Sequence, residues 1–201
     1  MIEQKKYMVE RNVVTNYKVP RKVTRKSLEK SAFYYLRRYS SSSENLRRIL
    51  FKRVKRSAQY HGTDVSVGQL WVDEFIEKFL ANKLLDDIQY AETKCLSVHR
   101  NGGSKQTIRK KLREKGIAPD IIEQTYTLLD QYSVDPELVA AAITARRRRL
   151  GPYRSRGHRN NFREKDLASL ARAGFNYSIA SRVIDVETIG HLEKEVGFTN
   201  W

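Results

Sequence analysis

Two adjacent carboxylates and a few histidines are the side chains of this sequence whose types could support acid–base or metal chemistry. Asp86 and Asp87 stand together in LLDDIQYAE (84–92), and the histidines are His61, His99, His158 and His191. The histidines form neither an HxxxH nor an HExxH pattern, and no second carboxylate cluster has metal-ligand spacing. Gln89 follows Asp86 by three residues, as in a capping box, so we expect the two carboxylates to begin a helix.

A nucleophile and a nucleotide site are equally hard to find. Cys95 falls on the same helical face as Ile88 and Ala91, which favours a buried structural thiol. A single cysteine also excludes an internal disulfide and a multi-cysteine zinc site. No GxxxxGK(S/T) loop is present. These residues therefore offer no plausible enzyme site, and we expect no catalytic residue, cofactor or metal.

Basic side chains are the remaining candidates for a functional site, and they are abundant. The chain has 201 residues and a formal net charge of +16, which favours a polyanionic partner or a partner that carries one. The charge is segregated: residues 28–62, 104–116 and 138–163 are strongly basic, and acidic segments separate them. The candidate partner- or nucleic-acid-binding residues are Arg47, Arg48, Lys52, Lys55, Arg56, Arg109, Lys110, Arg113, Arg147, Arg148, Arg154 and Arg156.

The longest run of basic residues, ARRRRLGPYRSRGHR (145–159), has the composition of a single binding site for a polyanion. Successive side chains of a helix are rotated by about 100° around its axis, so four consecutive side chains spread over about 300°. Arg146 to Arg149 therefore cannot all face one partner. We expect Arg146 to bury its stem and the run to end a helix before Gly151-Pro152. For any one such segment a solvated helix face is the simpler interpretation. Three segments at corresponding places favour binding.

The apolar pattern that must position these residues is helical almost throughout. Glycine and proline are sparse, and apolar residues recur every three or four positions. Trp71, Phe75 and Phe79 are expected in the core rather than on a base-stacking platform, whereas Tyr34, Tyr35 and Tyr39 are ambiguous.

An internal repeat is visible as well. LREKGIAPDIIEQTY (112–126) aligns with LARAGFNYSIASRVI (170–184), and SENLRRIL (43–50) resembles SKQTIRKKL (104–112) with one residue of slack. The predicted fold is all-α, an elongated tandem array of three three-helix units. The expected divisions are a basic N-terminal arm (1–26), unit 1 (27–84), unit 2 (85–133), unit 3 (134–186) and an acidic C-terminal tail (187–201).

These segments resemble the RecX family of bacterial recombinase modulators. The most recognisable is LLDDIQYAE (84–92), and SKQTIRKKLREKGI (104–117) resembles the basic helix of the family's second unit. The first unit is matched by RKSLEKSAFYYLRRYSSSSENLRRIL (25–50). The third unit, in its alphaproteobacterial form, is matched by DPELVAAAITARRRRLGPYR (135–154) and KDLASLARAGFNYSIASRVI (165–184). The resemblance covers roughly residues 25–186.

The resemblance implies a non-catalytic protein that binds the RecA recombinase and its single-stranded-DNA filament. It implies a role in DNA recombination, repair and the SOS response, in which filament growth, ATP hydrolysis and strand exchange are restrained. Weak direct DNA binding and a monomeric state are expected too. The N-terminus has charges where a secretory signal needs an apolar segment, and no membrane-length apolar run is present, so we expect a soluble cytoplasmic protein. The alternative is a general DNA- or RNA-binding helical repeat protein without a recombinase partner.

Overall fold

The computed structural model describes residues 19–133 and 135–197, and these residues form helices without any strand among them. The all-α prediction is therefore confirmed. Residues 1–18 of the predicted basic arm and residues 198–201 lie outside the described part. The helices are α1 (Arg25–Leu36), α2 (Ser43–His61), α3 (Val65–Ala81), α4 (Asp87–Arg100), α5 (Lys105–Glu114), α6 (Pro119–Tyr132), α7 (Pro136–Arg148), η1 (Gly151–Tyr153), η2 (Arg159–Phe162), α8 (Arg163–Arg172), α9 (Tyr177–Asp185) and α10 (Ile189–Glu195).

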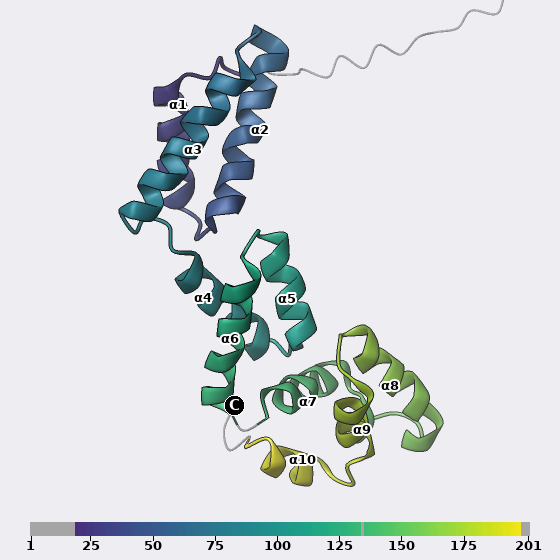
Figure 1. The fold of residues 1–201 in the computed structure, drawn as a ribbon. Helices are drawn as coiled ribbons and strands as arrows, with labels where there is room; N and C mark the ends of the chain where they lie inside the picture. The colour runs from purple at the N-terminus through teal and green to yellow at the C-terminus, as the bar shows by residue number, and fades with distance from the viewer. Residues whose placement is uncertain (1–18, 134, 198–201) are drawn as a thin grey trace, which may run out of the picture.

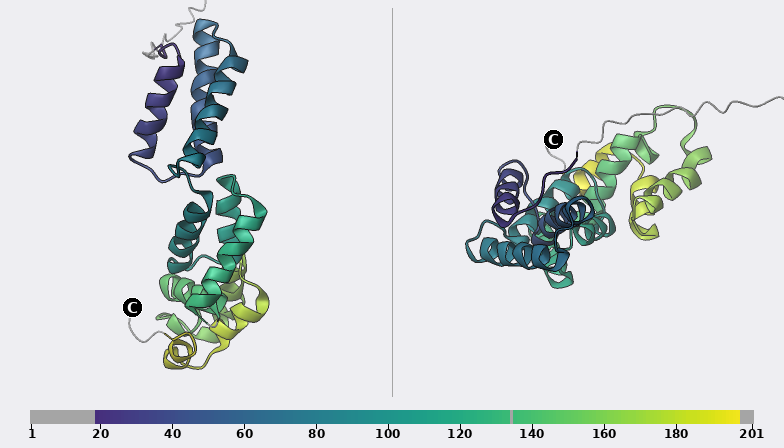
Figure 2. Two further views of the ribbon diagram at one scale, coloured as in Figure 1. Left: turned by 60° about the vertical axis from the view of Figure 1, so that its left-hand side comes forward. Right: turned by 90° about the horizontal axis from the view of Figure 1, so that it is seen from above.

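Three hydrophobic cores follow one another along the chain. The first is formed by α1 to α3, the second by α4 to α6 and the third by α7 to α10. The three bundles are arranged in series, so the molecule is elongated (Figure 1), and a second direction of view gives the same order (Figure 2). The unit boundaries given above remain predictions.

Short side chains fix where the helices begin. Asp86 caps α4, and its carboxylate accepts a hydrogen bond from the Gln89 amide at 2.9 Å, as the sequence predicts. Ser42 caps α2, and the neighbouring Ser43 is already the first helical residue. Pro119 and Pro136 occupy the first turns of α6 and α7, where a missing amide proton costs no helical hydrogen bond.

The aromatic stripe of α3 belongs to the first core, as predicted. Phe75 and Phe79 are buried, and Trp71 packs against them half-buried. At the other end of the molecule, α10 occupies part of the segment that the sequence assigns to an acidic tail. Leu192 of this helix is fully buried in the third core, so the segment contributes to packing.

A candidate binding surface at the joints between bundles

The second helices of the three bundles meet end to end. The N-terminus of α2 contacts the C-terminus of α5, and the N-terminus of α5 contacts the C-terminus of α8; we call these the α2–α5 joint and the α5–α8 joint. Ser42 Oγ donates a hydrogen bond to the Lys115 carbonyl at 2.5 Å, and Ser104 Oγ donates to the Ala173 carbonyl at 2.7 Å. Each serine thus caps its own helix and also satisfies a carbonyl at the end of the next bundle's helix.

A glycine makes each joint close enough for this contact. Gly116 and Gly174 follow α5 and α8 with φ values of +75° and +92°, a region that side chains rarely adopt. A Cβ atom on Gly116 would lie 2.2 Å from Glu44 Cγ, and one on Gly174 would lie 2.6 Å from Ser104 Oγ. These are the paired glycines of the sequence repeat. They are required by both backbone conformation and close approach.

A carboxylate from the next bundle's first helix reinforces each joint. Asp87 of α4 accepts from the Ser43 amide at 2.7 Å, and Glu137 of α7 accepts from the Lys105 amide at 3.0 Å. Both amides belong to the first turn of a helix, where they have no helical partner and where negative charge is favoured. Burial raises the pKa of the Glu137 carboxyl. Asp87 therefore has a structural role, as the sequence analysis expected of it.

The first pair of equivalent arginines holds each bundle together. Counted from the capping serines, Arg47 of α2 corresponds to Arg109 of α5. Arg47 forms an ion pair with Asp73 of α3, and Arg109 forms one with Glu123 of α6 at 2.8 Å. Each arginine thus ties the second helix of its bundle to the third. The charge of both predicted residues is compensated within the protein.

The α2–α5 joint is also charge-paired. Arg48 Nε donates to Glu44 at 2.9 Å, and Arg48 Nη1 donates across the joint to the Glu114 carbonyl at 2.8 Å. Lys115 Nζ donates in the opposite direction to the side-chain oxygen of Asn45 at 3.1 Å. The cations at this joint therefore contact atoms of the protein itself.

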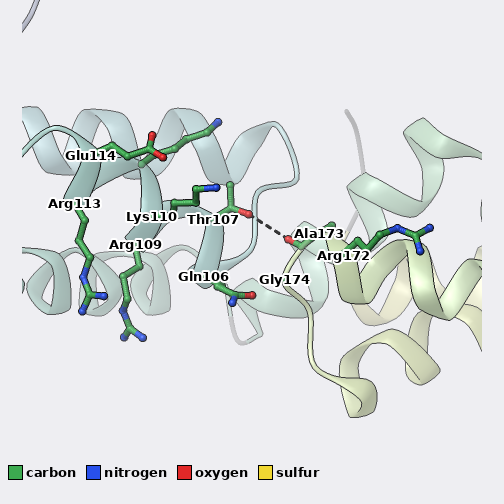
Figure 3. Close-up of a pocket in the computed structure, with 10 residues that line it drawn as sticks. Gln106, Thr107, Arg109, Lys110, Arg113, Glu114, Arg172, Ala173 and Gly174 are labelled. Atoms are coloured by element: carbon green, nitrogen blue, oxygen red, sulfur yellow. Dashed lines mark hydrogen bonds between the residues drawn. The ribbon is translucent and has the colours of Figure 1, made fainter.

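The α5–α8 joint has the same construction without this compensation. Gln106 stands where the first joint has Glu44, and Lys110 stands where it has Arg48. An open groove of about 890 Å³ lies here (Figure 3). It is lined by Gln106, Thr107, Arg109, Lys110, Lys111, Arg113, Glu114, Arg172, Ala173 and Gly174.

Four cations of this groove have no partner in the part of the chain that the structure describes. Lys110, Lys111, Arg113 and Arg172 make no ion pair or side-chain hydrogen bond within residues 19–133 and 135–197. Two of them, Lys110 and Arg113, are among the predicted binding residues. Lys111 and Arg172 were not. The repeat offered a signal for Arg172, because a shift of 58 residues places it where the first joint has Glu114. We call this surface the basic groove.

The other predicted cations lie outside the basic groove, and they differ in whether other groups of the protein contact them. Lys52 and Arg56 are exposed on α2 and have no partner among the described residues, whereas Lys55 lies 4.7 Å from the centre of the Phe51 ring. Arg147 donates to the Asn101 carbonyl at 2.9 Å. Arg148 donates to the carbonyl at the end of α8, on Ser169, at 3.1 Å. These two arginines also connect helices rather than pointing freely outward.

Arg154, another predicted binding residue, is held by contacts within the protein. Its guanidinium forms an ion pair with Asp166, whose side chain is only 2% exposed, and it lies 4.2 Å from the centre of the Phe162 ring. The same carboxylate accepts from the Gly151 amide at 2.8 Å. This pair therefore helps to fix the loop after α7. Arg156 nearby is exposed and unpaired in the described chain.

Sites for other chemistry are not apparent in the described residues. They contain no group of three or more His, Cys, Asp or Glu side chains that could hold a metal ion. Cys95 is fully buried, and this burial raises the pKa of its thiol. The Sγ atom lies 3.7 Å from the Thr125 carbonyl oxygen. The expectation of a structural thiol is confirmed. Among the same residues, none of the helices is apolar over a length that could cross a bilayer.

Comparison with known proteins places the chain in a family. A family model for the second three-helix domain of RecX matches residues 86–125. Over 169 residues the chain is 41% identical to the regulatory protein RecX of Myxococcus xanthus (strain DK1622), covering 84% of this chain and 89% of that protein. The chain belongs to the RecX family. The predicted family and the prediction of a non-catalytic regulatory protein are thereby confirmed.

Two further comparisons agree with this RecX membership. The regulatory protein RecX of Agrobacterium fabrum (strain C58 / ATCC 33970) is 32% identical over 160 residues, covering 79% of this chain and 82% of that protein. A crystal structure of regulatory protein RecX matches with a TM-score of 0.54 over 81% of this chain and 72% of that chain. At 20% identity the second match supports the fold alone. The RecX domain model covers α5 and with it most of the basic groove.

Proposed function

We propose that this protein binds RecA and its single-stranded-DNA filament and restrains filament growth, ATP hydrolysis and strand exchange. The observation that carries the proposal is the 41% identity to a regulatory protein RecX over most of both chains. The net charge of +16 suits a partner that carries DNA. We further propose that the protein acts as a monomer in the cytoplasm and that it contacts DNA directly, though weakly.

The basic groove is our proposed docking surface for the filament. Its unpaired cations can meet phosphate or carboxylate groups without first breaking an internal ion pair. The exposed, unpaired residues Lys52, Arg56 and Arg156 extend the proposed surface beyond the groove. Arg47 and Arg109 are weaker candidates because each already has an acidic partner in its own bundle.

A RecA ATPase assay on single-stranded DNA tests this proposal. The double variant Lys110→Glu/Arg113→Glu should require about tenfold more protein for half-inhibition, since two contacts become repulsive. The matched control is Lys165→Glu/Lys194→Glu, which changes net charge equally at exposed positions of α8 and α10. Equal inhibition by both double variants would remove the groove from the proposal. Absence of inhibition by the unaltered protein at any concentration would overturn the function itself.

Capture of RecA after nuclease treatment separates this function from general nucleic-acid binding. A complex that survives nuclease digestion requires protein–protein contacts. If the complex disappears, and if log K for duplex DNA falls with log salt by about 0.9 per neutralised phosphate, a DNA- or RNA-binding repeat protein is the better description.

A further inference from the structure

The outward face of α1 combines basic and aromatic side chains. Lys26, Lys30, Phe33, Tyr34 and Arg37 recur at helical spacing, and all five are exposed. Phe33 is 46% exposed and Tyr34 is 61% exposed. The opposite face packs into the first core through Leu28 and Ala32. Since α1 lies at the edge of its bundle (Figures 1 and 2), this face is open to solvent. We call it the α1 platform.

The cations of the α1 platform are not compensated by any of the described residues. Lys26, Lys30 and Arg37 make no ion pair or side-chain hydrogen bond within the described parts of the chain. The single acidic residue of α1, Glu29, lies off this face and pairs with Lys78 of α3 at 3.5 Å. The α1 platform thus has the free positive charge that most cations of the α2–α5 joint lack.

The aromatic rings are held in place on one side. Phe33 packs against the buried Phe79 with ring centroids 5.2 Å apart. Arg38 donates to the Tyr34 hydroxyl at 2.8 Å, and its guanidinium lies 5.3 Å from the ring centre. These contacts restrict the side chains before any partner binds, and they leave large parts of both rings in water. Such preorganised rings favour stacking, because less conformational entropy is lost on binding.

We propose that the α1 platform binds single-stranded nucleic acid, with bases stacked on Phe33 and Tyr34 and phosphates held by Lys30 and Arg37. Aromatic and basic side chains on one face suit a single strand, whose bases have accessible faces, whereas a duplex hides them. An acidic peptide would meet the cations but would make no equivalent use of the rings. The proposal deepens the direct DNA contact in the proposed function and concerns a surface distinct from the basic groove.

Binding of fluorescent oligothymidylate to the full chain, without RecA, tests the α1 platform. Tyr34→Ala should weaken binding about tenfold, as expected for the loss of one stacked base. Tyr60→Ala, which removes a 51% exposed ring near the end of α2, is the matched control and should have little effect. Circular dichroism of both variants verifies that the helices are retained.

A strand of the same length with abasic sugars separates stacking from charge. It carries the phosphates without the bases, so Tyr34→Ala should leave its binding almost unchanged. Lys30→Ala/Arg37→Ala should weaken binding of both strands and lower the salt slope by about 0.7 per lost phosphate contact. The inference fails if Tyr34→Ala and Tyr60→Ala behave alike, if the abasic strand suffers equally, or if duplex DNA of equal length binds as well as the single strand. Because RecA is absent, these outcomes do not depend on filament inhibition.

Discussion

The α2–α5 joint and the α5–α8 joint share their backbone construction but differ in charge. Both have a capping serine, a glycine with positive φ and a carboxylate from the next bundle. At equivalent positions the first joint has Glu44, Arg48 and Glu114, and the second has Gln106, Lys110 and Arg172. Stacking of the bundles therefore does not require the ion pairs. Charge at the second joint is free to serve a partner, and the following changes test that distinction.

The largest effect is expected from Gly116→Ala. A side chain there adopts a strained conformation and meets Glu44, so the free energy of unfolding should fall by about 2–4 kcal/mol. Gly62→Ala is the control, because Gly62 also has a positive φ of +61° but no atom lies within 4 Å of the point that a Cβ would occupy. Urea denaturation measures both. Equal losses would mean that close approach at the joint contributes nothing.

Removal of the joint hydroxyls should have a smaller effect. Ser42→Ala and Ser104→Ala each remove a helix cap and a hydroxyl donor to a carbonyl of the neighbouring bundle, at a cost of about 1–2 kcal/mol. Ser104→Ala should be the milder of the two, because the Ala173 carbonyl also accepts from Thr107 Oγ1 at 3.1 Å. Thr188→Ala removes only the cap of α10 and should cost less. A larger cost for Ser104→Ala than for Ser42→Ala in thermal unfolding would contradict this account of the two joints.

Exchanging the Glu44 and Gln106 side chains between the two joints should change stability in opposite directions and should affect RecA inhibition only at the α5–α8 joint. Gln106→Glu gives α5 a first-turn carboxylate beside Lys110, which should stabilise the protein by about 0.5 kcal/mol and weaken RecA inhibition. Glu44→Gln should destabilise it by about the same amount and leave inhibition nearly unchanged. Both stability effects should decrease in 1 M salt. Stronger inhibition by Gln106→Glu would contradict our assignment of the basic groove.

The smallest expected effect is a pH dependence at the α5–α8 joint. Burial raises the pKa of Glu137, so the native protein holds this proton to higher pH than the unfolded chain does. The resulting stabilisation is present at low pH and is lost as the pH rises through the native pKa. The melting temperature of the unaltered protein relative to Glu137→Gln should therefore increase as the pH falls from 7 to 4. A constant difference would show that the carboxyl titrates normally.

Periodicity and short motifs were sufficient to predict α1 to α9 and their serial arrangement, but not α10. The cap at Asp86 depends on residues three positions apart, and burial of Cys95 depends on one helical face, so both are local properties. The repeated glycines were visible as well. Their purpose was not, because the clash at Gly116 involves Glu44, a residue far away in the sequence.

The state of each arginine could not be predicted in the same way. Arg47 meets Asp73 of another helix, and Arg154 meets Asp166 across a loop, and both contacts depend on packing between elements. Arg146 is exposed as a residue, and Ala142 and Ala145 provide the buried face of α7. Sequence patterns locate cations on a helix. Only the arrangement of neighbouring helices decides which of them are free.

The serine contacts between bundles also give the molecule a polarity. At both joints an N-terminus meets a C-terminus, so α8, α5 and α2 follow one another in the same sense. A head-to-tail series of this kind has two different ends and no twofold axis. If the molecule were bound in the reverse orientation along a polar polymer, it would therefore present its charged surfaces in a different order. Such a protein can distinguish one direction of a polymer from the other.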